Sequence, residues 1–301
     1  MNVEQLATRP RWFDVLVQRA TRADGQPPFS DGSLVELATG GRTLLVIGDV
    51  AAALYAPGEA EFVVDPDARR HGHGTELFEH LLALDAGLRV WAHGDHRAAR
   101  ILAASHGLEP VRELLQLRAA VAEPTVPEPA EGPHRAAGAS TSSATGAGSA
   151  TGAGQATGAG PATGAFRVGR DEDAWLGLNA RAFAAHPEQG AVTRAELDVL
   201  VAEPWFDAHD FLLLRDGDDL VGYCWLKVEH GIGEFYVVGV SPDRQGAGLG
   251  RRLVEAGLER LAERGIRTAS LYVEADNAPA LALYRSFGFG DHSIDIQYAR
   301  P

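Results

Sequence analysis

The clearest indication of the fold is Gln245-Gly246-Ala247-Gly248-Leu249-Gly250, which joins an apolar strand to an amphipathic helix. The preceding residues 233–240 are predicted to form the strand, and residues 249–263 carry apolar side chains at helical spacing. The first N–H groups of a helix lack internal partners, the helix dipole adds positive charge there, and glycines let an anion approach closely. The loop therefore fits either a diphosphate cradle or a simple tight turn, and its own residues do not choose between them.

The flanking residues extend this pattern into alternating strands and helices. The C-terminal half is predicted to contain strands at 211–214, 220–228, 233–240 and 268–273 and helices at 249–263 and 278–287. Asp276 and Asn277 are good capping residues directly before the last of these helices. The N-terminal half repeats the order, with strands at 42–47, 59–64 and 89–92 and helices at 75–84 and 98–105. This order predicts an α/β fold.

The two halves match residue by residue, which indicates an internal duplication. The segment from Asp65 to Gly74 lies 176 positions before the segment from Ser241 to Gly250, and the proline, the basic or amide residue and both glycines coincide. Further on, Ser105-His106-Gly107-Leu108 matches Ser286-Phe287-Gly288-Phe289. Two ordered matches make coincidence a poor explanation.

Composition narrows the class of protein. The chain has 301 residues and a net charge of −14, which argues against a general nucleic-acid binder and against an anionic membrane surface. Its one cysteine, Cys224, excludes an internal disulfide and favours a reducing compartment. No apolar stretch is long enough to span a bilayer. We therefore expect a soluble cytoplasmic protein. We also expect a monomer, although composition does not bear on this.

The middle of the chain differs from both halves. Residues 121–165 are rich in proline, then in alanine, glycine, threonine and serine, and the hexad Ala-Thr-Gly-Ala-Gly-X starts at Ala144 and repeats at Ala150 and Ala156, with a truncated copy at Ala162. Such a segment buries too little apolar surface to offset its ordering entropy. It is predicted to be a flexible linker between a domain of residues 1–120 and a domain of residues 166–301.

The loop and a second motif together resemble the GCN5-related N-acetyltransferases. That family has the loop pattern Q/R-x-x-G-x-G/A after a strand, and its later signature resembles the run from Asn277 to Phe289. The resemblance implies two tandem domains, each a mixed, mostly antiparallel sheet flanked by helices, that use acetyl-CoA. It implies that Tyr284 faces the departing thiolate. The implied cofactor contacts are Val238, Gly239, Val240, Gln245, Gly246, Ala247, Gly248, Leu249, Gly250, Arg251, Asn277, Ala278, Pro279, Ala280, Leu281 and Ala282.

The N-terminal copy keeps a complete loop but not the chemistry. By the same resemblance its acetyl-CoA contacts are Phe62, Val63, Val64, Arg70, His71, Gly72, His73, Gly74 and Thr75. At the offsets of the two matches, Ala103 stands where the second half has Tyr284, and Gly58 stands where it has Glu234. The first domain is therefore predicted to be non-catalytic. It either binds acetyl-CoA without turning it over or serves as a structural partner.

Several strings also resemble the mycothiol synthase family, which acetylates the cysteinyl amine of Cys-GlcN-Ins. They are His186–Gly190, Trp205–Asp207, Gly233–Val240 and Leu271–Asn277, with Phe62–Val64 and Trp91–Gly94 in the first half. The resemblance implies acceptor contacts at Asp31, Glu188, Lys227, Glu234 and Tyr272. Glu234, acting through a water, is the expected base for an α-amine with a pKa of about 8. The backbone N–H near Val238 would polarise the acetyl carbonyl, and Tyr284 would protonate the thiolate.

Two other functions remain open at this point: a tandem acetyltransferase for another amine, and a non-catalytic acyl-CoA sensor. Each residue also has an ordinary explanation, since Glu234 and Lys227 could face solvent, Glu188 could belong to a turn, and Tyr272 could pack in the core. No metal site is expected, because His71 and His73 fit the phosphate loop and His93 and His96 lack enough neighbouring ligands.

Overall fold

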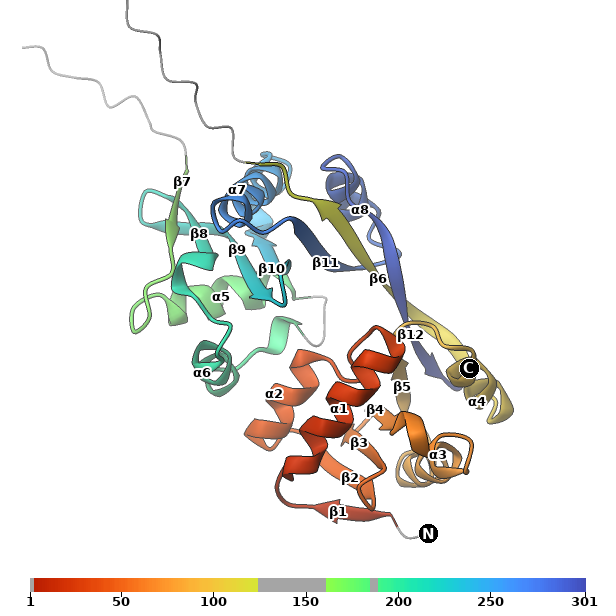
Figure 1. Ribbon diagram of the computed structural model, residues 1–301. Coiled ribbons are helices and arrows are strands. Elements are labelled where there is room, and N and C mark those ends of the chain that lie inside the picture. The colour runs from red at the N-terminus through yellow and green to blue at the C-terminus, as the bar shows by residue number, and fades with distance from the viewer. Residues whose placement is uncertain (1–2, 124–160, 185–188) are drawn as a thin grey trace, which may run out of the picture.

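The computed structural model describes residues 3–123, 161–184 and 189–301 (Figure 1). The helices and strands of the N-terminal half are β1 (Glu4–Leu6), α1 (Arg11–Asp24), α2 (Asp31–Thr39), β2 (Thr43–Ile47), β3 (Ala51–Ala56), β4 (Glu59–Val64), α3 (His73–Leu84), β5 (Arg89–Ala92), α4 (Arg97–Ser105) and β6 (Glu109–Ala120). Those of the C-terminal half are β7 (Ala162–Ala165), α5 (Glu172–Ala182), α6 (Arg194–Ala202), β8 (Phe211–Asp216), β9 (Asp219–Glu229), β10 (Ile232–Val240), α7 (Leu249–Glu263), β11 (Thr268–Glu274), α8 (Ala278–Arg285) and β12 (Gly290–Ala299). Four short 3-10 turns lie at Pro66–Ala68, Gln189–Ala191, Ala208–Asp210 and Pro242–Arg244.

The α/β fold and the duplication predicted from the sequence are confirmed. In each half a strand runs into the glycine-containing loop and a helix follows, with β10 before α7 and β4 before α3. Within the described parts of the chain, two strand pairs are parallel, β4 with β5 and β10 with β11, and the others are antiparallel, so both halves are mixed and mostly antiparallel. Among the described residues, no helix combines the length and the apolar composition needed to cross a membrane.

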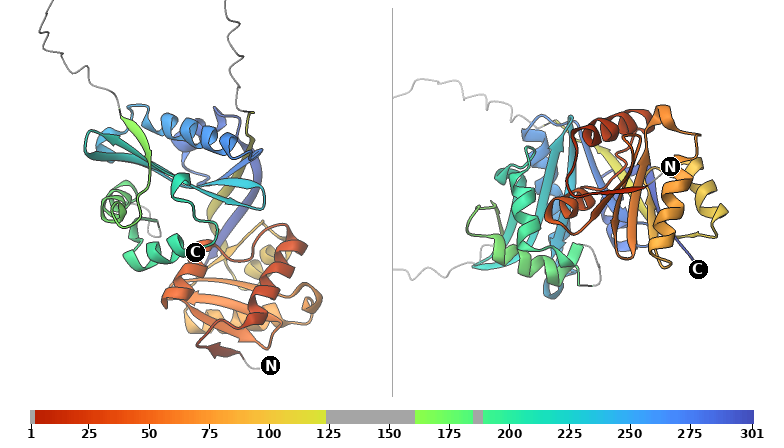
Figure 2. Two further views of the ribbon diagram at one scale, coloured as in Figure 1. Left: turned by 60° about the vertical axis from the view of Figure 1, so that its left-hand side comes forward. Right: turned by 90° about the horizontal axis from the view of Figure 1, so that it is seen from below.

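The two halves share one sheet because they exchange their last strands. The sheet has twelve strands in the order β1-β2-β3-β4-β5-β12-β6-β11-β10-β9-β8-β7. Strand β6, from the first half, pairs with β11 of the second half, and β12, from the second half, pairs with β5 of the first. Figure 1 shows β6 and β12 crossing together between the two halves, and Figure 2 shows the same junction from two other sides. The sequence domains of residues 1–120 and 166–301 are thus interlocked.

The end of the predicted linker is wrong. Residues 162–165, the truncated hexad, form β7, which pairs antiparallel with β8 from Ala162 opposite Arg215 to Ala165 opposite Leu212. An edge strand needs only backbone hydrogen bonds to one neighbour, so the exposed Ala-Thr-Gly-Ala run can pair without burying its side chains. Most of the segment, residues 124–160, lies outside the described residues.

Helices cover both faces of this sheet. One face carries α3, α4, α7 and α8 over apolar clusters that include Leu77 and Phe78 in the first half and Leu253 and Leu261 in the second. The other carries α1 and α2 over Phe13 and its neighbours, and α5 and α6 over an aromatic cluster around Trp225. The glycine loops thus open helices on the same face in both halves.

Candidate active site

The predicted phosphate loops have matching backbone conformations. Gly246 and Gly248 have φ of 80° and 77°, and Arg70 and Gly72, the corresponding residues of the first half, have φ of 68° and 89°. Neither α7 nor α3 has a side-chain cap at its N-terminus. The first N–H groups of both helices are therefore available to an anion, which fits the diphosphate of a coenzyme. Asn277, by contrast, caps α8 by accepting a hydrogen bond from the Ala280 N–H at 3.2 Å.

A gap between β10 and β11 lies next to the glycine loop of the second half, residues 245–250. The parallel pairing of these strands stops at Phe235 opposite Leu271. Beyond it, no strand of the described residues pairs with the β11 side of β10 at Val238, Gly239 and Val240. A bulge in β10 between Phe235 and Val237 changes the direction of the strand at the same place. Unpaired backbone groups along this edge can bind the extended arm of a coenzyme. Gly239 is required there, since a Cβ would lie 2.5 Å from the Tyr223 ring.

Glu234 lies at the start of this gap, on the face of the sheet that carries α5 and α6. It is directly opposite Lys227 on β9 and Ser270 on β11. Burial raises the pKa of Glu234 to about 7; the carboxylates of Asp31 and Glu229 raise it as well, while Lys227 lowers it. A carboxylate with a pKa near neutrality can both take up and release a proton at working pH.

The other predicted acceptor contacts gather around Glu234 from both halves. Asp31, the first residue of α2, accepts a hydrogen bond from Lys227 Nζ at 2.5 Å, and Lys227 also lies 3.1 Å from Glu229. Asp31 and Glu229 raise the pKa of Lys227 although burial opposes its charge. Tyr272 lies on β11, and the Glu234 charge is one cause of its raised pKa, after burial. Glu188 lies outside the described residues.

Tyr284 approaches the gap from the opposite face. It projects from α8 into the apolar cluster under α7 and α8, with its ring centroid 5.8 Å from that of Phe289. Burial raises the pKa of its phenol, so Tyr284 is protonated at neutral pH and can only donate a proton. Burial also raises the pKa of the Cys224 thiol, which leaves the one cysteine as a neutral core residue.

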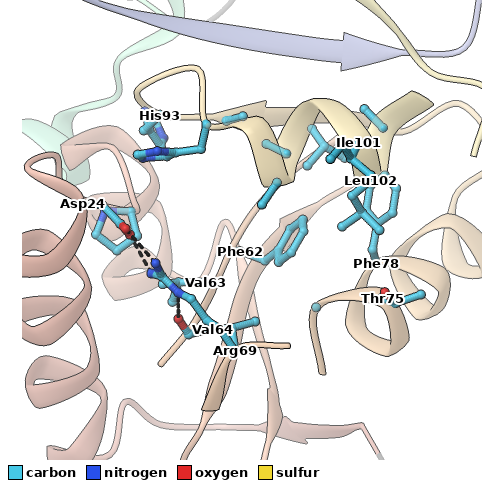
Figure 3. A pocket seen from close by; sticks show the side chains of 18 of the residues that line it. Asp24, Phe62, Val63, Val64, Arg69, Thr75, Phe78, His93, Ile101 and Leu102 are labelled. Carbon is cyan, nitrogen blue, oxygen red and sulfur yellow. Dashed lines mark hydrogen bonds and ion pairs between the residues drawn. The ribbon is translucent and has the colours of Figure 1, made fainter. Parts of the chain in front are cut away.

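The N-terminal half encloses a cavity of about 810 Å³ at the equivalent place (Figure 3). All of its predicted coenzyme contacts except His71 line this cavity. Arg69, which also lines it, is held by a two-pronged ion pair to Asp24, at 2.6 and 2.7 Å, and donates to the Val64 carbonyl, as Figure 3 shows. The apolar walls and free helix start suit a coenzyme arm and its diphosphate.

The first half differs from the second at the positions that correspond to Glu234 and Tyr284. Its β4 has no bulge, so the strand register places Glu59 rather than Gly58 at the position of Glu234, and the fixed offset used for the sequence match is wrong by one residue here. Glu59 is paired with Arg42 at 2.5 Å and accepts from Gln297 Nε2 at 3.2 Å. Ala103 is buried where the second half has Tyr284.

Sequence reasoning missed a buried ionic cluster beside this cavity. His93 Nδ1 lies 2.8 Å from Asp295 on β12, and Nε2 lies 3.6 Å from Glu61. Burial opposes its charge, but these two carboxylates raise the pKa of His93 to about 10. The imidazolium therefore links the two halves. Among the described residues, no group of three or more His, Cys, Asp or Glu side chains could hold a metal ion.

Comparison with known proteins agrees with this architecture. The pattern of the acetyltransferase (GNAT) family matches residues 179–289. A mycothiol acetyltransferase of Clavibacter michiganensis is 48% identical to this chain, covering 95% of it and 89% of that protein, and one of Thermomonospora curvata is 42% identical, covering 95% and 92%.

Two solved structures share the fold at low sequence identity. The tandem GNAT protein of the clavulanic acid biosynthesis pathway has a TM-score of 0.60 at 16% identity, covering 99% of this chain and 97% of that one. A GCN5-related N-acetyltransferase from Sphaerobacter thermophilus has a TM-score of 0.60 at 22% identity, covering 99% and 96%. With relatives so similar over almost its whole length, the chain belongs to the mycothiol acetyltransferase family of GCN5-related N-acetyltransferases.

Proposed function

We propose that the chain transfers the acetyl group of acetyl-CoA to the cysteinyl amine of Cys-GlcN-Ins, 1D-myo-inositol 2-(L-cysteinylamino)-2-deoxy-glucopyranoside, in mycothiol biosynthesis. The observation that carries this proposal is Glu234, whose pKa of about 7 suits a base and which stands where the gap beside β10 meets the acidic group of Asp31 and Glu229. A cluster of carboxylates attracts a protonated amine, and a carboxylate with a pKa near neutrality can then remove its proton.

The chain's own residues divide the work between the two faces of the sheet. Acetyl-CoA supplies the acetyl group as a thioester. The loop from Gln245 to Arg251 binds its diphosphate, and the unpaired edge of β10 around Val238 holds the arm and polarises the carbonyl through a backbone N–H. Glu234 takes the proton of the acceptor amine, directly or through a water. Tyr284 donates its proton to the departing thiolate.

The carboxylates around Glu234 suit an acceptor amine that is protonated in solution. An α-amine with a pKa of about 8 is largely protonated at neutral pH and must lose a proton before it can attack.

Asp31 and Lys227 come from different halves of one chain and meet at 2.5 Å, so one chain can supply the whole acceptor site. We therefore infer that the protein acts as a monomer, in the cytoplasm, where a lone thiol stays reduced.

The first half is proposed to bind acetyl-CoA without turnover. Its cavity and loop support binding. The straight β4, the pairing of Glu59 with Arg42 and the alanine at position 103 support the absence of catalysis. The carboxylate at the position of Glu234 is held by a guanidinium, and the described residues of this half place neither a bulge nor a phenol at the equivalent positions.

The test is an assay of thiol release from acetyl-CoA by the full chain. Cys-GlcN-Ins should be acetylated on nitrogen, and Glu234→Gln should lower kcat by at least about 100-fold, the usual contribution of a general base. Glu259→Gln, which changes an exposed glutamate on α7, is the matched control. Turnover with other amines but not with Cys-GlcN-Ins would contradict the acceptor assignment, and an active Glu234→Gln would contradict the assignment of the base.

A further inference from the structure

A row of buried and half-buried polar side chains crosses the middle of the shared sheet. Gln116 on β6 stands directly opposite Tyr272 on β11 and also opposite Ser293 on β12. The three side chains point to the face that carries the acceptor residues, and Gln26, just after α1, covers them. Gln116 and Gln26 are 6% and 8% exposed.

These side chains form a continuous chain of hydrogen bonds. Gln26 Nε2 donates to Ser293 Oγ at 2.7 Å and to Gln116 Oε1 at 3.3 Å. The Ser293 hydroxyl donates to Gln116 Oε1 at 3.2 Å. Gln116 Nε2 in turn donates to Tyr272 Oη at 2.7 Å. Two donors on its oxygen fix the orientation of the Gln116 amide, with the nitrogen toward Tyr272.

This orientation decides what Tyr272 can do. A tyrosine hydroxyl has one proton and can accept hydrogen bonds on its oxygen. Because Gln116 supplies a donor to that oxygen, the proton of Tyr272 is left to donate elsewhere. Burial and the nearby carboxylates of Glu234, Asp295 and Asp31 raise the pKa of the phenol, which keeps the proton in place.

We propose that Gln116 is a positioning residue for the transferase reaction, which holds the Tyr272 hydroxyl as a hydrogen-bond donor to an oxygen atom of the acceptor. The proposal rests on the proposed function and on the acceptor contact that the family resemblance implies for Tyr272. It assigns to the N-terminal half a second contribution to the acceptor site besides Asp31, made through the exchanged strand β6.

The test is a double-mutant cycle in the full chain with Gln116→Leu and Tyr272→Phe. Each single variant should raise the KM for Cys-GlcN-Ins by about fivefold to tenfold, as expected for one neutral hydrogen bond. The KM for acetyl-CoA and kcat should change less than twofold. The double variant should be no worse than Tyr272→Phe alone, since Gln116 acts through the hydroxyl that this variant lacks.

Gln297→Leu is the matched control, because it removes another buried glutamine of the shared sheet. Gln297 donates a hydrogen bond to Glu59 in the first half. It should leave the acceptor KM within twofold. If Gln116→Leu does not fold, Ser293→Ala replaces it in the cycle, with a smaller effect on the same parameter. Effects of Gln116→Leu and Tyr272→Phe that multiply, or an unchanged acceptor KM in Gln116→Leu, would overturn the inference while wild-type turnover still supports the function. No turnover by the wild type would instead overturn the proposed function.

Discussion

The charges around Glu234 predict how two substitutions change the pH dependence of kcat/KM. With saturating acetyl-CoA, kcat/KM for the acceptor should rise with pH through about 7, because only ionised Glu234 can accept a proton. Lys227→Met removes a positive charge that favours the carboxylate, so this rise of kcat/KM, the acidic limb of the pH profile, should move to higher pH. Asp31→Asn removes a negative charge that opposes it, so the limb should move to lower pH.

The size of the first shift follows from the strand register. Glu234 and Lys227 are directly opposite on β10 and β9. The Cβ atoms of opposed residues lie about 5 Å apart. Two unit charges at a similar separation interact by roughly 2–3 kcal/mol at an effective dielectric constant of about 20 to 40. Since one pKa unit corresponds to about 1.4 kcal/mol, the limb of Lys227→Met should move up by about one to two pH units.

The assay is initial-rate thiol release between about pH 5.5 and 9.5 at constant ionic strength, a range that includes the wild-type midpoint near 7 and the midpoint expected for Lys227→Met. The acceptor amine titrates near pH 8 in every variant and cancels from the comparison. Both substitutions also touch proposed acceptor contacts, so the height of the profile will fall, but its midpoint reports the ionisation alone. Shifts in the same direction, or no shift in either variant, would refute the assignment of Glu234 as the base.

Three further predictions address other parts of the molecule. Tyr284→Phe should lower kcat by about 100-fold with little change in the acetyl-CoA KM, because no acid remains for the thiolate; wild-type kcat in this variant would refute the role. Gly72→Val should reduce acetyl-CoA bound per chain from two molecules to one in native mass spectrometry, since its φ of 89° is strained for valine; two molecules in the variant would contradict the N-terminal site. The raised pKa of His93, about 10, means that its stabilisation is complete below its ordinary pKa near 6.5 and is lost as pH approaches 10. The wild-type Tm should therefore fall more steeply than that of His93→Gln between those values, and parallel curves would exclude this contribution.

Local patterns predicted the loops and the elements next to them. The glycines at 246 and 248, the helical spacing after Leu249 and the capping residue Asn277 each depend on residues close in sequence, and the structure places all three as expected. Helix α6 could have been found in the same way. Thr193 and Glu196 form a capping box, in which each side chain accepts from the other's backbone N–H.

Features that depend on distant contacts were not predictable in this way. Gln116 and Tyr272 are 156 positions apart, and nothing near either residue signals that β6 enters the sheet of the other half. The error at Gly58 has a related cause. The bulge at Tyr236 inserts one residue into β10, and an offset taken from the loop cannot detect an insertion on the far side of it. The acceptor contacts predicted at Asp31 and Lys227 rest on resemblance, and only the fold brings these two side chains within 2.5 Å.

The place of β12 between β5 and β6 sets the order in which the molecule can be completed during synthesis. Until Gly290–Ala299 has left the ribosome, β5 is paired with β4 on one side only, and His93 lacks the carboxylate of Asp295. Pairings between such distant segments raise the contact order, which slows folding. The nascent chain therefore carries an open strand edge from the synthesis of β5 until that of β12, the ten-residue strand that joins β5 to β6.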